Sequence, residues 1–236
     1  ALAIDGKPAC VLVVPEGHYA SAVALVQGAI RDRTGVEAPM MAIAGDDTDL
    51  ETLLADTHVV TFGNMATNPC LHHLYSRWLT LLDLRWPGKG GHALLSLHNP
   101  FGNGGNAILV GGSDATGVEG AAQVLVERIA SSPGGTLGWL HDIVLGDAQV
   151  PPEPWKGDQV AYWAGTPGGV GALGSRLCFG WNSIATYAAL YYMTGREAYA
   201  HHFKRLAMSR PGHVPEDMRS DYAYWNPANP IVETYH

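Results

Sequence analysis

The stretch NAILVGGSDATGVEGAAQVLVERI, residues 106–129, places residue types that could do chemistry at a turn between an apolar strand and an amphipathic helix. Such a turn binds phosphate when its glycines read GxGxxG, or GxxxxGK followed by Ser or Thr, because each glycine lets the backbone approach the phosphate. The three glycines here fit neither spacing, and no lysine follows them. The spacing therefore argues against a phosphate site.

Ser113 is the candidate nucleophile in the same turn. The residues from Gly111 to Ala115 differ at one position from the GxSxG elbow that carries the serine of many hydrolases. In an elbow the helix begins directly at the serine, whereas residues 116–119 form a capping box that predicts a helix start three residues later. We interpret Ser113 as a turn residue and the whole turn as a connector.

Histidines and a cysteine supply the candidate metal ligands. They are the pairs His72–His73 and His201–His202 and the mixed set Cys70, His72 and His98. Adjacent residues on a helix diverge by ~100°, so neither histidine pair chelates one metal ion by itself. The mixed set stays an alternative, and we expect no metal site.

Three aspartates, Asp46, Asp47 and Asp49, form the candidate calcium loop. The later Gly and Glu of an EF-hand are missing, so a solvated turn is the favoured interpretation. The sequence therefore predicts no cofactor, with a structural calcium ion as the alternative.

Three cysteines allow at most one internal disulfide. Cys10 is expected at the start of one strand and Cys70 beyond the carboxyl end of another, which places them at opposite edges of a parallel sheet. A disulfide needs a Cα separation of ~5.5 Å, so a bridge between these two is not expected. A bridge from Cys70 to Cys178 stays open, and buried free thiols are the default expectation.

Charge and aromatic residues are distributed unevenly along the 236 residues. Residues 1–148 hold 7 Lys+Arg against 15 Asp+Glu and residues 149–236 hold 7 against 7, so the net charge of −8 lies in the first part. Of the 21 aromatic residues, 14 lie in residues 149–236. An acidic chain without a basic patch is a poor nucleic-acid binder, and no apolar run reaches the ~18 residues of a membrane span.

Residues 1–148 alternate strand and helix patterns, which predicts a three-layer α/β domain. Apolar runs predict strands at 9–15, 39–45, 58–63, 92–100 and 106–112, the last two as a pair. Helical spacing predicts helices from Tyr19 to Thr34, from Leu50 to Leu54, and from Leu71 to Leu84 with Trp78 in its core stripe, followed by the helix after the quoted turn.

The proline-rich stretch QVPPEPWKGD, residues 149–158, predicts a linker or domain boundary. Beyond it the pattern is helical only. Apolar spacing from Trp181 to Tyr192 predicts one helix, and Thr194 to Glu197 form a break and capping box before a second helix that ends near Pro211. Two helices with a short turn form an αα-hairpin.

Together these segments resemble two known kinds of domain. The segments PEGHYASAVALVQGAIRDRTG and ILVGGSDATGVEGAAQVLVERI resemble the α/β accessory domain that precedes the catalytic domain of hexosaminidase-like and α-glucuronidase-like glycosidases. The segment WNSIATYAALYYMTGREAYAHHFKRLAMSR resembles the opening helical hairpin of the (α/α) toroid in heparinase II/III-like polysaccharide lyases. A toroid needs roughly ten or more helices, so residues 149–236 would be only its start, completed by further polypeptide or another chain.

The lyase resemblance implies proton abstraction next to a uronic acid carboxylate, with Tyr or His as base and acid and with Asn or Arg relieving the carboxylate charge. The implied catalytic residues are Tyr222, Tyr224 and His236, and the implied substrate-binding residues are Asn182, Arg219, Trp225 and Asn226. Packing of these aromatic residues between the two parts is the alternative. Glu216, Asp217 and Asp221 are the candidates for a glycosidase acid.

These observations favour the N-terminal portion of a secreted or periplasmic enzyme that cleaves an acidic polysaccharide by β-elimination. The start of the chain, ALAIDGKPAC, suggests a processed N-terminus. A glycoside hydrolase on the same architecture is one alternative. A non-catalytic module that binds glycan, or docks its helical face on a partner, is the other.

Overall fold

The computed structural model describes residues 1–45, 49–151 and 186–208. The chain divides into two compact units, Ala1–Gln149 and Val150–His236. Each unit is described by itself. No helix in the described ranges has the length and apolar character needed to cross a membrane.

The first unit is built on a six-stranded mixed sheet with the order β4-β3-β5-β7-β6-β8. The strands are β3 (Val11–Pro15), β4 (Met40–Ile43), β5 (Val59–Gly63), β6 (His92–His98), β7 (Asn106–Gly112) and β8 (His141–Val144). The first four in the order are parallel, and β6 runs antiparallel to both of its neighbours. Strand β5 is buried along its whole length, as expected of a central strand with helices on both faces.

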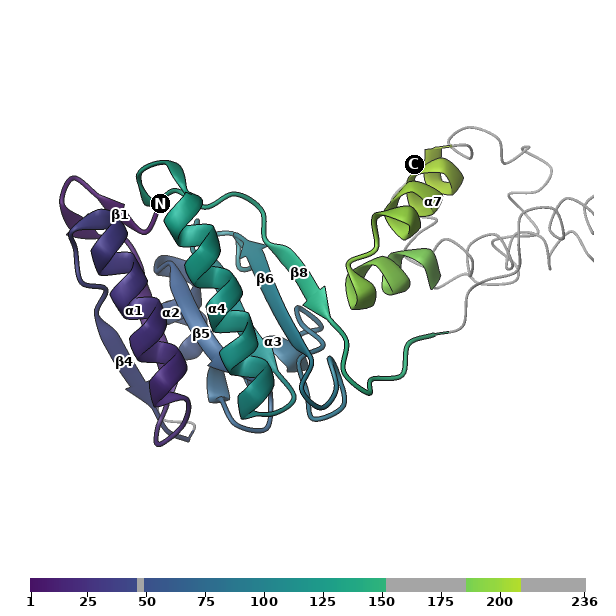
Figure 1. The fold of residues 1–236 in the computed structure, drawn as a ribbon, viewed down its shortest axis with the longest axis horizontal. Helices are drawn as coiled ribbons and strands as arrows, with labels where there is room; N and C mark the ends of the chain where they lie inside the picture. Colours follow the sequence, from purple (N-terminus) through teal and green to yellow (C-terminus); the bar gives the residue numbers. More distant parts are fainter. Residues whose placement is uncertain (46–48, 152–185, 209–236) are drawn as a thin grey trace, which may run out of the picture. The chain divides into compact units, whose positions relative to one another are not determined.

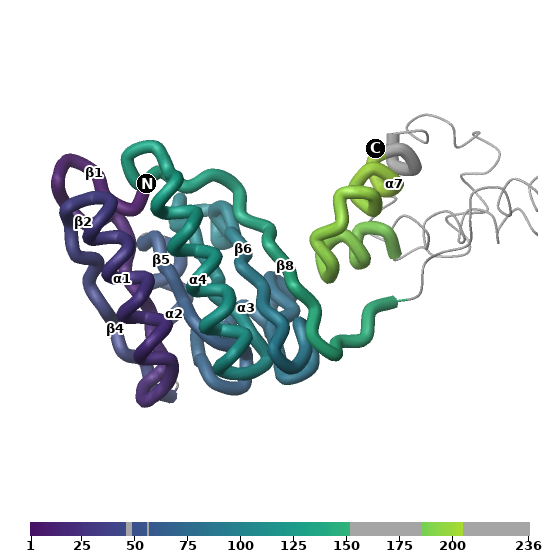
Figure 2. Tube along the Cα trace, viewed as in Figure 1, coloured from purple at the N-terminus to yellow at the C-terminus, as the bar shows by residue number. Residues whose placement is uncertain are grey.

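Helices cover both faces of this sheet, which confirms the predicted α/β class (Figure 1). Helices α1 (Ala20–Thr34) and α4 (Ala115–Ser131) lie side by side on one face, and α2 (Leu50–Asp56) and α3 (Pro69–Ser76) lie on the other. The main apolar cluster joins the inner stripes of α1 and α4 to β3, β5, β6 and β7. A small ribbon, β1 (Ala3–Ile4) and β2 (Lys7–Pro8), lies beside the C-terminal end of α1 (Figure 2).

The helix predicted from Leu71 to Leu84 is wrong in its second half. Helix α3 ends at Ser76, and Trp78 adopts a left-handed conformation with φ 60° and is 86% exposed instead of lying in the core. Helix α3 ends there in a left-handed cap, in which the Trp78 N–H donates to the Tyr75 carbonyl and the Leu79 N–H donates to the Leu74 carbonyl, both at 3.0 Å.

The second unit contains two described helices, residues 186–194 and α7 (Glu197–Met208), separated at Gly195 with φ 66°. The Tyr187 ring stacks on His202 at a centroid distance of 4.9 Å and is tilted against Tyr199 at 6.2 Å, so the two helices pack on each other. Thr194 does not complete the expected capping box, because α7 begins at Glu197. Its hydroxyl instead donates to the Leu190 carbonyl at 2.6 Å and accepts from the Arg196 N–H at 3.3 Å.

Candidate functional site

The residues that the lyase resemblance singles out lie outside the described ranges. They are Asn182, Arg219, Tyr222, Tyr224, Trp225, Asn226 and His236, together with the alternative acids Glu216, Asp217 and Asp221. Their arrangement therefore stays a prediction. The sites that the structure does describe all belong to the first unit or to the helix pair of residues 186–208.

The turn between β7 and α4 is held by its own side chains and by the side chain of Asn64. Helix α4 begins at Ala115 with Asp114 as its N-cap, which corrects the start expected at Thr116. The Asp114 carboxylate accepts the N–H of Gly117 at 2.8 Å and the N–H of Gly90 at 3.0 Å. A carboxylate already occupies the helix N-terminus, so this turn has no place left for a phosphate.

Ser113 behaves as a structural residue in this turn, as interpreted from the sequence. Its Oγ accepts a hydrogen bond from the Gly88 N–H at 2.9 Å, and its carbonyl accepts one from Asn64 at 3.3 Å. Among the described residues, neither a histidine nor a carboxylate is hydrogen-bonded to this hydroxyl. A nucleophilic serine needs such a base within reach, so this hydrogen bonding favours the structural role of Ser113.

Two buried asparagines follow β5 and connect it to its surroundings. Asn64, 0% exposed, donates from Nδ2 to the carbonyl of Gly112 at 2.9 Å and accepts the N–H of Ala66 at 3.0 Å. Asn68 caps α3 by accepting the Cys70 N–H at 2.9 Å, and its Nδ2 donates back into β5. The hydrogen bonds of both amides are therefore used to fix the carboxyl edge of the sheet.

Tyr19 joins the loop after β3 to the loop after β5. It has φ 58° and ψ 26°, an unusual left-handed conformation for an aromatic residue, and its hydroxyl donates to Thr67 Oγ1 at 2.9 Å. A Cβ built on Gly63 would lie 2.7 Å from both the Tyr19 ring and Thr67 Oγ1, so only glycine fits there. The Tyr19 ring therefore packs against Gly63 at the end of β5, on the carboxyl edge of the sheet.

A shallow pocket of about 500 Å³ opens beside these residues. It lies where β4 and β5 flank β3 on opposite sides, the topological switch point at which open α/β sheets commonly bind ligands. Its lining includes Glu16 and His18 after β3, Gly45 after β4, and Thr67, Pro69 and His72 after β5.

The titratable side chains of this pocket are exposed. The side chains of Glu16, His18 and His72 make no hydrogen bond with any other residue that the structure describes. Catalytic acids, bases and nucleophiles are held by partners that fix their geometry. The pocket therefore offers room for a ligand but no oriented catalytic group.

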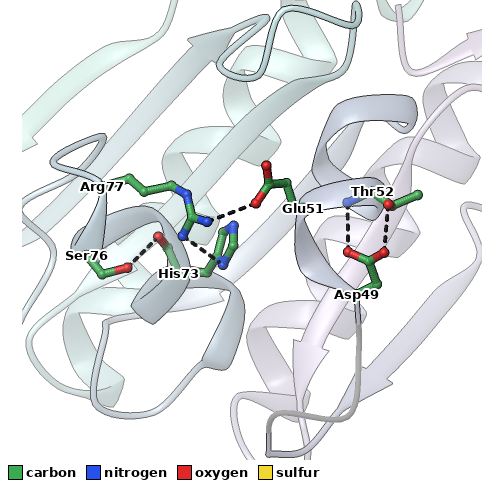
Figure 3. A network of polar contacts seen from close by, with 6 residues as sticks. All are labelled: Asp49, Glu51, Thr52, His73, Ser76 and Arg77. Atoms are coloured by element: carbon green, nitrogen blue, oxygen red, sulfur yellow. Dashed lines mark hydrogen bonds and ion pairs between the residues drawn. The ribbon is translucent and has the colours of Figure 1, made fainter.

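The polar network between α2 and α3 also has a structural explanation (Figure 3). Arg77 donates to Glu51 at 2.9 Å and contacts His73 Nδ1 at 3.2 Å, so it ties the two helices together. Burial, and then the Arg77 charge, hold the pKa of His73 below its ordinary value. Because the ion pair is largely exposed, its contribution to stability is small.

Asp49, one of the candidate calcium ligands, caps α2. Its carboxylate accepts the Thr52 hydroxyl at 2.7 Å and the Thr52 N–H at 3.1 Å, and these hydrogen bonds lower its pKa. Asp46 and Asp47 lie outside the described ranges. Within those ranges no group of three or more His, Cys, Asp and Glu side chains is placed to hold a metal ion, so Cys70, His72 and His98 are not brought together.

Cys10 and Cys70 are buried free thiols, as the strand directions predicted. Burial raises the pKa of Cys10 to about 11 and that of Cys70 to about 12. A reactive cysteine needs a lowered pKa, so neither thiol is a nucleophile. Cys178 lies outside the described ranges.

The sequence interpretation missed the asparagines after β5. Two signals could have found them: the segment GNMATNP directly follows a buried strand, and an Asn-Pro pair is a strong helix start. Neither signal shows that the two side-chain amides bond to other protein groups and not to a ligand.

The fold and site define the first unit as an α/β domain whose polar sheet edge is bonded internally. No protein-family model matches the chain, and no curated protein matches it either.

Proposed function

We propose that this chain is the N-terminal portion of a polysaccharide-degrading enzyme and that its first 149 residues form a non-catalytic α/β accessory domain. The observation that carries the accessory role is the internal hydrogen bonding of Asn64, Asn68, Tyr19 and Asp114 at the carboxyl edge of the sheet. Enzymes on open α/β sheets use this edge to bind and convert ligands. Side chains that already have protein partners are not available for that task.

The chemistry is then assigned to the second unit. Residues 150–236 have no net charge and hold 14 of the 21 aromatic residues, and aromatic faces are suited to stacking on sugar rings. The proposed reaction is β-elimination on an acidic polysaccharide, with Tyr222, Tyr224 or His236 as base and acid. Asn182, Arg219, Trp225 and Asn226 would bind the substrate.

The proposed reaction balances without an added co-reactant. The base removes the proton on the carbon next to the uronic acid carboxylate, and the carboxylate spreads the charge that develops. The glycosidic C–O bond breaks, a carbon–carbon double bond forms in the ring, and the acid protonates the leaving oxygen.

Two further elements belong to the proposal. A pair of helices buries little apolar surface alone, so additional polypeptide, from the same protein or another chain, would complete the helical ring. A secreted or periplasmic location fits an enzyme whose substrate is an extracellular polymer.

Incubation of the chain with a panel of uronic-acid polysaccharides tests the assignment. A lyase product is an unsaturated uronide that absorbs at about 232 nm, whereas a hydrolase releases reducing sugar without this absorbance. Tyr222→Phe should reduce a lyase rate, and Ser113→Ala is the matched control that should not. Reducing sugar alone would favour the hydrolase and its acids, and binding without product would favour a non-catalytic module.

A further inference from the structure

The loop between β6 and β7 contains the one Asn-Gly pair of the sequence, Asn103 and Gly104. Both residues are exposed. The side-chain amide of an asparagine can react within its own chain, because the backbone nitrogen of the next residue can attack its carbonyl carbon. A glycine in that next position has no Cβ, so the nitrogen is unhindered and the backbone adapts to the attack. Sequence and exposure therefore favour this reaction at Asn103.

The side chain of Asn99 holds the nitrogen that would attack. Its Oδ1 accepts the Gly104 N–H at 2.6 Å. Asn99 is itself fixed, because its N–H donates to Asn106 Oδ1 at 2.9 Å and its carbonyl accepts the Gly102 N–H at 3.2 Å. It has φ 46°, a left-handed conformation that asparagine adopts more readily than most residues. The Gly104 nitrogen must give up the hydrogen that it donates before it can attack, so this hydrogen bond opposes the reaction.

We propose that Asn103 is a site of spontaneous deamidation and that Asn99 slows this reaction in the folded chain by binding the Gly104 N–H. The Gly104 nitrogen loses its proton to solvent and forms a bond to the side-chain carbonyl carbon of Asn103. The side-chain nitrogen leaves as ammonia, and a five-membered succinimide remains. Water from the solvent then opens the ring at either carbonyl carbon and leaves aspartate or isoaspartate. The step needs no oxidant or reductant, and it is independent of the proposed function.

The reaction would change the contact between this loop and α2. The N–H of Gly105, a buried residue, donates to the Ala55 carbonyl at 2.9 Å. A Cβ built on Gly105 would lie 2.3 Å from the Leu54 carbonyl oxygen, so the loop and the helix approach closely. An isoaspartate carries the main chain through its side chain and adds one methylene group between Asn99 and Gly105, which are both held by hydrogen bonds. We therefore expect the isoaspartate form to lose the hydrogen bond from Gly105 to Ala55.

Incubation of the full chain at mildly alkaline pH, with peptide mapping by mass spectrometry at successive times, tests the site. Deamidated product should accumulate at Asn103 and not at the buried Asn64 and Asn68 in the same digest. Asn99→Gly suits the left-handed backbone but lacks the acceptor oxygen, so its Asn103 should react roughly 2–10 times faster, the factor expected for the loss of one hydrogen bond. Asn99→Asp keeps an acceptor oxygen and is the matched control, with a rate within about twofold of the unmodified chain's.

The same chain unfolded in urea should deamidate faster at Asn103 than the folded chain, because the hydrogen bond from Gly104 to Asn99 is then absent. No product at Asn103 in urea would overturn the site, and an equal or faster rate in the folded chain would overturn the protection. Acceleration in Asn99→Gly but not in Asn99→Ala would assign the effect to backbone flexibility and reject the role of Asn99. Hydrogen exchange at Gly105 should rise in the isolated isoaspartate form, and unchanged exchange there would overturn the expected loss of contact with α2.

Discussion

Three glycines on the helices of the first unit allow a graded test of whether close packing requires glycine at the start of α4. Each is replaced by alanine in the full chain: Gly28 in α1, and Gly120 and Gly117 in α4. Gly117 lies in the first turn of α4, where a phosphate site would need glycine for a ligand and a connector needs it for close packing. The structure predicts a different outcome at each position.

The contacts that a new Cβ would make set the order. At Gly28 it meets nothing within 4 Å, so the better helix propensity of alanine should stabilise the unit by about 0.5–1 kcal/mol. At Gly120 it lies 2.9 Å from His92 Nδ1, a side chain that can shift, so the net change should be within about 1 kcal/mol. At Gly117 it lies 2.1 Å from the Gly91 carbonyl oxygen, and overpacking against backbone should cost about 2–3 kcal/mol.

Hydrogen exchange of peptides from β5 and β7 measures these changes in the first unit alone. Exchange through global opening changes tenfold for each ~1.4 kcal/mol, so Gly117→Ala should exchange roughly 30–150 times faster and Gly28→Ala about 2–5 times slower. Equal rates for Gly117→Ala and the unmodified chain would show that the close approach to Gly91 is not needed, and the connector interpretation would lose its physical basis.

Further tests follow from single residues. Asn64→Ala should destabilise the first unit by about 2–4 kcal/mol in the same exchange measurement, because it leaves the Gly112 carbonyl buried without its partner; a change below about 1 kcal/mol would contradict this. Cys10 and Cys70 should resist alkylation at pH 8 in the native chain and react on unfolding; fast native alkylation, measured by intact mass, would contradict their burial. Because the pKa values of both thiols are raised from 9.0 in the folded chain, its stability should also fall as the pH rises above 9. Burial lowers the pKa of His92 in the folded chain, so stability should fall as the pH drops below 6.5, the ordinary pKa of histidine. This dependence of stability on pH should be weaker in His92→Phe, and an unchanged dependence would assign the effect to other groups.

The central strands were predictable because strands buried on both faces consist of continuous runs of apolar residues. The runs 9–15, 58–63 and 106–112 contain β3, β5 and β7. Strand β8, residues His141–Val144, was missed because it lies at the sheet edge and reads HDIV, with polar residues that give no such run. Edge strands are half-exposed, so apolar content alone does not reveal them.

Helix ends were harder to predict than helices, because two signals can compete for one end. Asp114 and Thr116 are both N-cap residue types at the start of α4, but only Thr116 has a Glu three positions later that would complete a capping box. Asp114 is the one used, and its carboxylate also binds the Gly90 N–H, a residue 24 positions away. That second hydrogen bond depends on the tertiary structure and has no signature in the local sequence. The end of α3 was missed for another reason: Trp78 takes the left-handed cap position that glycine usually occupies, so its residue type gives no signal of a helix end.

The hydrogen bonds at the carboxyl edge support the non-catalytic role proposed for the first unit. A donor stabilises a transition state only if it can direct its hydrogen bond to charge that develops there. Asn64 and Asn68 are 0% and 1% exposed and give their amide hydrogens to protein acceptors, so redirecting them would break the sheet edge. Under the proposed function, bond cleavage therefore falls to the residues that follow this domain.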